Sequence, residues 1–327
     1  MYSWIRWNGT SISFRDDRSP QETAVGCTPT VQSRPASPPE LHGELLRELI
    51  MPPSSCPGPP CQDLYIYYLK GRVAPDPVLG DPGFIGNWEE EQDSFLFFKC
   101  DCEPLVQGLL ERQPQLELAD RFEMTYDQWH GGPLEAFHVG QLHVTPPWLA
   151  NGQTDAAPSI LLDPGVVFGT GTHPTTNDCL NALQSAFKRL PVARVLDLGT
   201  GTGLLALAAA RLGASHIVAV DLNALAAATA LRNVRMNAMA DRILVVRGDA
   251  KNFMDLPCDL MVSNIHYEVM RLLVAAPGFR TKKQFILSGL LRSQAREIEH
   301  QLMQGPARIL EKWDRDGIWY TFYGAHA

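Results

Sequence analysis

Apolar runs with strand character alternate with helical segments from residue 160 onward, and this alternation constrains the fold of the 327-residue chain more than any other feature. Helices are predicted from the glycines after residue 198 to Leu212 and over 224–237. Such alternation is typical of a parallel sheet covered by helices. Five runs rich in Val, Ile and Leu predict its strands, at 194–198, 216–220, 243–246, 259–262 and 284–287.

The flanking segments predict two additions to this sheet. Residues 307–313 and 319–323, joined through Asp314-Arg-Asp-Gly317, predict a terminal antiparallel hairpin. Residues 61–150 predict a small α+β domain, which a loop over 151–158 connects to the rest. Within that domain we expect strands at 64–69, 93–99 and 122–124, a helix at 104–113 and a turn at 83–88. The predicted domains are therefore 1–60, 61–150 and 151–327.

The N-terminal segment has a different composition. Residues 18–60 contain ten prolines, which exclude a continuous helix or sheet, so residues 1–60 are predicted to be a poorly ordered extension with one short helix over 41–51. The first 17 residues are polar and charged and lack the apolar stretch of a secretory signal. No run of 18 apolar residues occurs. We therefore expect a cytoplasmic protein without a membrane span.

Charge and cysteine usage limit the partners. The net charge of −8 argues against binding along a nucleic-acid backbone. Residues 61–150 hold 15 acidic and 5 basic side chains, a balance of −10, which leaves +2 for the remainder. This acidic segment is either a solvated surface, which charge alone favours, or an attractor for a basic partner. The seven cysteines are scattered without a CxxC pair, which predicts free buried thiols and no metal site.

The strongest local motif is Asp197-Leu-Gly199-Thr-Gly201-Thr-Gly203, between the first strand and its helix. Ligands bind at this position in α/β folds, and glycines let the backbone turn tightly beside them. Leu204 stands where a dinucleotide fingerprint needs glycine, and the third glycine comes one place early. The pattern therefore disfavours a nicotinamide cofactor and favours a nucleoside that carries an amino-acid tail.

Polar residues follow the next three strands. Asp221, 22 residues after Gly199, is predicted to accept hydrogen bonds from both hydroxyls of a ribose. Asp249 lies where an adenine edge is expected, and either its carboxylate or the amide of Ala250 binds the exocyclic amine, or Asp249 merely caps a loop. The amide oxygen of Asn264 is suited to accept a hydrogen bond from a reacting amine.

The segment before the first strand, DPGVVFGTGTHPTT at 163–176, contains three glycines, Phe168, His173 and several hydroxyls. It is either a flap over the ligand or an ordered loop. Together with VLDLGTGTGLLALAAARLGA, IVAVDLN and VSNI it resembles the bacterial ribosomal protein L11 methyltransferase family, from about residue 161 to the C-terminus.

The resemblance implies a ferredoxin-like substrate-recognition domain, a linker and a Rossmann-like class I methyltransferase domain. It implies S-adenosylmethionine as cofactor and a basic ribosomal protein as partner, methylated on a lysine side chain or N-terminal amine. His266-Tyr267 stands where the family has a small apolar pair, and water or His266 is expected to accept the amine proton. Asn264 and His266 are thus the catalytic candidates. Cofactor contacts carried over by motif fall on Phe168, Thr170, Gly171, Thr176, Gly199, Gly201, Asp221 and Asn264.

Two other classes of function stay open. A related enzyme that methylates another protein or a small amine fits the same motifs. A ribosome-associated binding module with a vestigial cofactor site also fits, although the intact glycines and Asp221 disfavour it.

Overall fold

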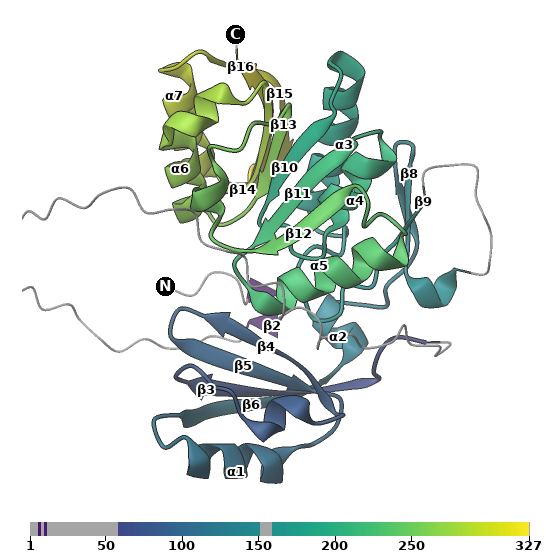
Figure 1. The fold of residues 1–327 in the computed structure, drawn as a ribbon, viewed down its shortest axis with the longest axis vertical. Helices are drawn as coiled ribbons and strands as arrows, with labels where there is room; N and C mark the ends of the chain where they lie inside the picture. The colour runs from purple at the N-terminus through teal and green to yellow at the C-terminus, as the bar shows by residue number, and fades with distance from the viewer. Residues whose placement is uncertain (1–5, 8–9, 12–57, 151–158, 327) are drawn as a thin grey trace, which may run out of the picture. The chain divides into compact units, whose positions relative to one another are not determined.

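The computed structural model describes residues 6–7, 10–11, 58–150 and 159–326 (Figure 1). The chain divides into two compact units, Met1–Pro52 and Pro53–Ala327. In the first unit, strands β1 (Arg6–Trp7) and β2 (Thr10–Ser11) form an antiparallel pair. The helix predicted over 41–51 lies outside the described residues.

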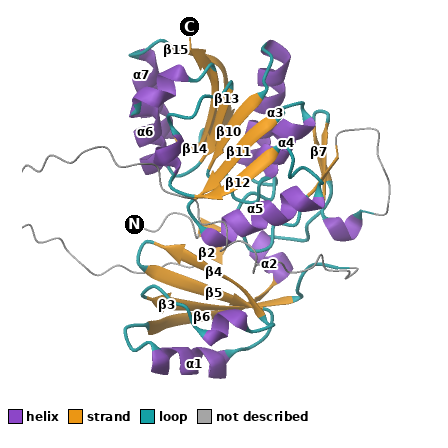
Figure 2. Ribbon diagram, in the orientation of Figure 1, coloured by secondary structure: helices purple, strands orange, loops and turns teal. Residues whose placement is uncertain are grey.

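The second unit contains a seven-stranded sheet in the order β12-β11-β10-β13-β14-β16-β15. The first five strands in this order are parallel, and β16 runs antiparallel between β14 and β15 (Figure 2). The predicted parallel sheet with a terminal hairpin is confirmed. The strands are β10 (Arg194–Leu198), β11 (His216–Asp221), β12 (Ile243–Arg247), β13 (Leu260–Asn264), β14 (Gln284–Leu291), β15 (Ala307–Arg315) and β16 (Trp319–His326).

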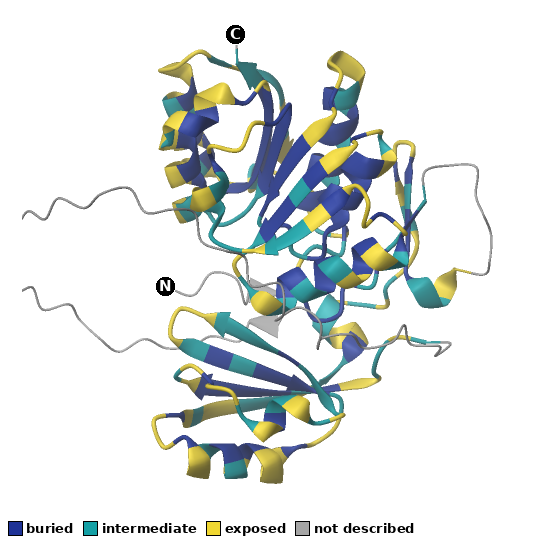
Figure 3. Cartoon of the chain, viewed as in Figure 1, coloured by how far each residue is buried: buried dark blue, intermediate teal, exposed yellow. Residues whose placement is uncertain are grey.

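Helices cover both faces of this sheet. Neighbouring residues of a strand point to opposite faces, so a strand that is apolar throughout presents an apolar surface on each side for helices to cover. In β14, Ile286 faces the core beneath α3 and α4, whereas Phe285 and Leu287 face the core beneath α6 and α7. Figure 3 shows the central strands β13 and β14 as largely buried, whereas the edge strands β12 and β15 are partly exposed. The helices are α3 (Pro174–Arg189), α4 (Leu204–Arg211), α5 (Ala224–Met236), α6 (Tyr267–Ala275) and α7 (Arg292–Met303), with short 3₁₀ turns η3 (Ala250–Phe253) and η4 (Pro277–Thr281).

A separate four-stranded antiparallel sheet has the order β4-β5-β3-β6. The helix α1 and the turn η1 pack on one face, over a core that includes Tyr67, Leu96 and Leu109. This sheet and its helix confirm the predicted small α+β domain, which precedes the large sheet along the chain. Its elements are β3 (Asp63–Lys70), η1 (Pro77–Gly80), β4 (Phe84–Glu90), β5 (Asp93–Phe98), α1 (Glu103–Arg112) and β6 (Glu117–Thr125).

The turn predicted at 83–88 is wrong. These residues belong to the edge strand β4, which pairs with β5 and places Trp88 opposite Phe95. The turn itself lies at Glu91, whose φ of 52° is left-handed. A strand that ends in glutamates at a sheet edge lacks the apolar run by which buried strands are identified.

A third sheet joins β7 (Phe137–Val139), β8 (Leu142–Thr145) and β9 (Ser159–Leu161). Its buried residues Val139, Leu142 and Ile160 belong to the same core as α3 and α4. Two short helical segments flank β7 and β8, namely α2 (Tyr126–His130) and η2 (Pro147–Leu149). The domain boundary near residue 150 stays a prediction. Among the described residues, no helix has the length and apolar character to cross a membrane.

Candidate functional site

The glycine turn after β10 is held by the neighbouring strand. The amides of Gly199 and Thr200 donate to the carbonyl of Val220 over 2.8 and 3.0 Å. Gly199 and Gly201 have φ of 76° and 55°. A Cβ at Gly199 would lie 1.9 Å from Ile265 Cγ2, and one at Gly201 would lie 2.6 Å from the Phe168 carbonyl oxygen. Only glycine fits at these two positions, so the sequence builds a bare backbone turn at the carboxyl edge of the sheet.

Asp221 lies against this turn at the end of β11. Its Oδ2 accepts from the Gly201 amide and its Oδ1 from the Asn223 amide, both over 2.9 Å. Burial raises the pKa of Asp221, and these amides oppose the rise. Because each carboxylate oxygen has a second lone pair, Asp221 is oriented to accept two further hydrogen bonds.

Asp197 is a site residue that the sequence motif did not single out as a contact. Its side chain is buried under the glycine turn, and its Oδ2 accepts from Thr200 Oγ1 over 2.6 Å. Its Oδ1 has no hydrogen bond of normal geometry among the described residues. Burial, together with the nearby charge of Asp221, raises the pKa of Asp197 to about 7. Such a carboxylate is stabilised by a cation. The one sequence signal that could have identified Asp197 as a site residue is its position directly before the glycine turn.

The flap loop, residues 163–173, is attached to the same turn. Thr202 Oγ1 donates to the Gly169 carbonyl over 2.7 Å. The Phe168 ring, with 42% of the residue exposed, contacts His173 at a centroid distance of 5.4 Å. The Thr170 and Thr172 hydroxyls lie 2.7 Å apart. The flap loop is therefore an ordered segment that borders the glycine turn.

The N-terminus of α3 meets the end of β13 beside the flap loop. Asn264 Nδ2 donates to Thr175 Oγ1 over 3.3 Å, and His173 Nδ1 lies 2.7 Å from the same hydroxyl. A Cβ at Gly289 would lie 3.0 Å from Asn264 Oδ1. With Nδ2 engaged, Oδ1 is the atom of Asn264 suited to accept from a ligand. The hydroxyl of Thr176 is buried and has no hydrogen-bond partner among the described residues.

Two predicted residues cap helical segments. Asp249 accepts from the Lys251 amide at Oδ1 and pairs with Lys251 Nζ at Oδ2, both over 3.0 Å. Each oxygen of Asp249 keeps a second lone pair, so the adenine contact stays open between this carboxylate and the amide of Ala250. His266 caps α6, where its Nδ1 accepts from the Glu268 amide over 3.4 Å.

Direct contacts bring part of the predicted cofactor set together at the carboxyl edge of the parallel strands. Gly201 contacts Asp221 and Phe168, Gly199 packs on Ile265, and Asn264 contacts Thr175, the residue before Thr176.

The other two predicted contacts have different neighbours. Gly171 approaches Phe137 so closely that a Cβ would lie 2.1 Å from the ring, and the Thr170 hydroxyl lies 2.7 Å from that of Thr172. The roles of Thr170, Gly171 and Thr176 in cofactor binding stay predictions.

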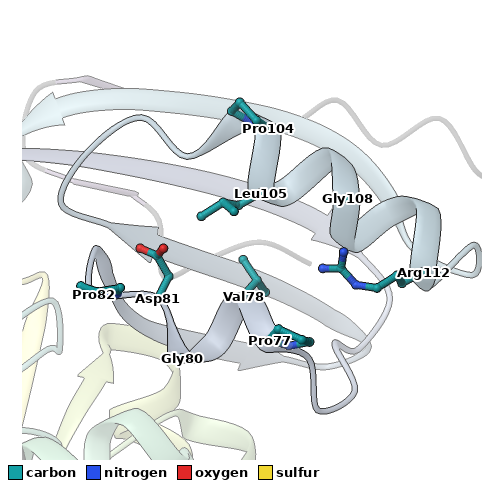
Figure 4. Close-up of a pocket in the computed structure, with 9 residues that line it drawn as sticks. All are labelled: Pro77, Val78, Gly80, Asp81, Pro82, Pro104, Leu105, Gly108 and Arg112. Atoms are coloured by element: carbon teal, nitrogen blue, oxygen red, sulfur yellow. The ribbon is translucent and has the colours of Figure 1, made fainter.

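A groove between η1 and α1 lies apart from this edge (Figure 4). It contains none of the predicted site residues. Arg112, at one end, makes two hydrogen bonds of 2.9 and 2.8 Å to Asp76. Its lining residues are Pro77, Val78, Gly80, Asp81, Pro82, Pro104, Leu105, Gly108 and Arg112.

Five parallel strands followed by an antiparallel hairpin, with a glycine turn after the first strand and a carboxylate after the second, define the class I methyltransferase fold. The chain belongs to the ribosomal protein L11 methyltransferase (PrmA) family, whose model matches residues 111–326.

Individual relatives agree with this assignment. A ribosomal protein L11 methyltransferase of Myxococcus xanthus is 30% identical over 263 residues, which cover 80% of this chain and 87% of the relative. One from Desulfitobacterium hafniense is 40% identical over 158 residues, covering 48% and 50%. In four of the relatives the match spans 50% to 62% of the relative's length. The crystal structure of a ribosomal protein L11 methylase from Lactobacillus delbrueckii subsp. bulgaricus is similar with a TM-score of 0.51 and 28% identity, covering 59% of this chain and 98% of that one.

Proposed function

We propose that this protein transfers a methyl group from S-adenosylmethionine to an amino group of ribosomal protein L11. The observation that carries the proposal is the Asp221 carboxylate, which two amides fix against a bare glycine turn. The proposed substrate is taken from the names of the relatives, which are ribosomal protein L11 methyltransferases. A ribosomal substrate implies that the protein acts in the cytoplasm.

The residues at the sheet edge fit the cofactor. Asp221 suits the ribose hydroxyls, and the glycine turn lets the ligand approach the backbone closely. A cation near the buried carboxylate of Asp197 would favour its ionised form, so this residue suits the cationic amino-acid part of the cofactor. The partly exposed ring of Phe168 supplies an apolar surface on the flap loop. When bound, S-adenosylmethionine supplies an electrophilic methyl group on a sulfonium centre.

The acceptor amine must be neutral to react. A free lysine with a pKa of about 10.4 is neutral roughly once in two thousand molecules at pH 7, and an α-amine with a pKa of about 8 about once in ten. Asn264 Oδ1 orients such an amine by accepting one of its N–H groups. His266 Nδ1 accepts a hydrogen bond from the Glu268 amide in the cap of α6. We therefore assign acceptance of the amine proton to water, with His266 as the alternative acceptor.

The acidic segment is the proposed recognition part. Its edge strand β4 packs on the start of α5, where the Asn223 side chain donates to the Glu89 carbonyl over 3.3 Å. Asn223 also donates its amide to Asp221, so this edge adjoins the proposed ribose site. Burial and the charge of Glu91 raise the pKa of Glu90, and nearby His266 lowers it. We assign the attraction of a basic protein to the carboxylates of this edge.

Calorimetric titration tests the cofactor assignment. S-adenosylmethionine is expected to bind the wild-type protein, and Asp221→Ala to weaken it strongly, because the ribose loses its charged acceptor. Tighter binding of NAD, or equal affinity of the variant for S-adenosylmethionine, would overturn the assignment. Binding without methyl transfer to any protein or amine of a cell extract would instead support the binding-module alternative.

A further inference from the structure

His130, at the end of α2, connects the small antiparallel domain to the flap loop. Its Nε2 lies 2.9 Å from the carbonyl oxygen of Gly165. Burial lowers the pKa of His130 to about 4, so the ring is neutral at pH 7. Since a carbonyl only accepts, the neutral ring carries its proton on Nε2 and donates it to Gly165. The ring is also fixed edge-to-face against Tyr126, with centroids 4.6 Å apart.

The next flap residue is anchored in the same place. Val166 is 4% exposed and packs in a cluster with Leu64, Ile66, Phe97 and Tyr126, all from the small domain and α2. One hydrogen bond and one buried side chain thus attach the first half of the flap loop to this domain.

The flap loop is attached to α5 and the glycine turn on either side of Gly165 and Val166. At its start, Asn233 of α5 donates to the carbonyls of both Asp163 and Thr202, over 3.0 and 2.9 Å. Thr202 in turn donates to the carbonyl of Gly169. Phe168 therefore lies between an anchor in the small domain, at Gly165 and Val166, and an anchor in the glycine turn, at Gly169.

We propose that His130 is a positioning residue that sets the flap loop for cofactor binding and couples it to the small domain. The inference rests on the proposed function for its cofactor, whereas the anchoring itself does not. Loss of the His130 hydrogen bond frees the Gly165 carbonyl and the segment that presents Phe168. The flap loop then samples other conformations. The cofactor binds only those molecules whose flap loop is correctly placed, so its apparent dissociation constant rises.

Two substitutions separate the hydrogen bond from the ring packing. His130→Phe keeps a ring against Tyr126 and removes the donor. His130→Gln keeps an N–H donor at about the distance of Nε2 and removes the ring. His138→Ala is the control for loss of a histidine ring, because the described ring contact of His138 is with His143, on which it stacks across β7 and β8 at a centroid distance of 4.1 Å. Thermal melting of each variant verifies that it is folded.

Hydrogen–deuterium exchange of the cofactor-free proteins gives the first readout, and titration with S-adenosylmethionine the second. His130→Phe is expected to exchange the amides of residues 165–171 about fivefold faster or more and to raise the dissociation constant by a similar factor. His130→Gln should restore both values, and His138→Ala should match wild type.

Unchanged exchange in a folded His130→Phe protein would overturn the anchoring. Faster exchange with an unchanged dissociation constant would leave the anchoring intact and overturn its coupling to the cofactor site. Failure of the wild-type protein to bind S-adenosylmethionine would overturn the proposed function, while the exchange data would still decide the anchoring.

Discussion

Replacing Asp197 with Asn should stabilise the cofactor-free protein in a pH-dependent manner. The pKa of Asp197 is raised from 3.8 to about 7, chiefly by burial. A carboxyl whose pKa is higher in the folded state stabilises the fold fully below pH 3.8, and this contribution disappears as pH rises through 7. A difference of roughly three pKa units corresponds to a loss of about 4 kcal/mol at pH 8, as an upper value.

The asparagine side chain of the Asp197→Asn variant is neutral at every pH and keeps an oxygen that can accept from Thr200 Oγ1. The free energy of unfolding, measured in urea from pH 3.5 to 8.5, should therefore be similar for both proteins at the acid end. It should be greater for Asp197→Asn at the alkaline end, by as much as about 4 kcal/mol. Asp259, whose pKa is about 2, is present in both proteins and cancels in the difference.

A matched control is Asp241→Asn, because the Asp241 side chain is 74% exposed. This variant should change the unfolding free energy little at either pH. The reasoning is refuted when the stability difference between wild type and Asp197→Asn does not grow as pH rises. Titration at pH 8 should at the same time show weaker binding of S-adenosylmethionine to Asp197→Asn, because the cation loses its charged neighbour.

Two further variants test other parts of the site. Gly199→Ala should abolish cofactor binding, because its Cβ would lie 1.9 Å from Ile265 Cγ2. The control is Gly305→Ala, whose Cβ would have its nearest neighbour 3.8 Å away and which should bind the cofactor normally in the same titration. Joint replacement of Glu89, Glu90 and Glu91 by Gln should raise KM for the protein substrate and flatten its salt dependence, since exposed charges are screened over about 8 Å. A KM insensitive to both salt and this substitution would mean that the acidic segment is only a solvated surface.

The centre of the large sheet could be predicted because strands β10, β13 and β14 are buried on both faces. Such strands are nearly continuous apolar runs, as at 194–198, and local composition is enough to find them. The edge strand β4 was missed, and β6 extends over nine residues where only three were expected, because exposed positions interrupt both with polar side chains. Helix α1 was predicted within one residue at each end.

The candidate site was predictable where it follows strand ends and not where it depends on distant contacts. Asp221 and Asn264 follow from strand boundaries alone. The burial of Asp197 depends on the turn that closes over it, and the pairing of His130 with Gly165 joins residues 35 apart. No local pattern encodes such pairings. Asp249 and His266 both cap helical segments, a role that is compatible with contact to a ligand, so their predicted roles in the site stay predictions.

Methyl transfer to purified ribosomal protein L11 tests the central claim most directly. Labelled S-adenosylmethionine is incubated with L11 and wild-type protein, Asp221→Ala or Asn264→Ala, and label in the L11 band is measured under steady-state conditions. Wild type is expected to label L11. Asp221→Ala should label less because its KM for the cofactor is raised, and Asn264→Ala should show a lowered kcat at saturating substrates. Absence of label in L11 with a wild-type protein that binds the cofactor would contradict the proposed substrate, and equal labelling by all three proteins would contradict the proposed site.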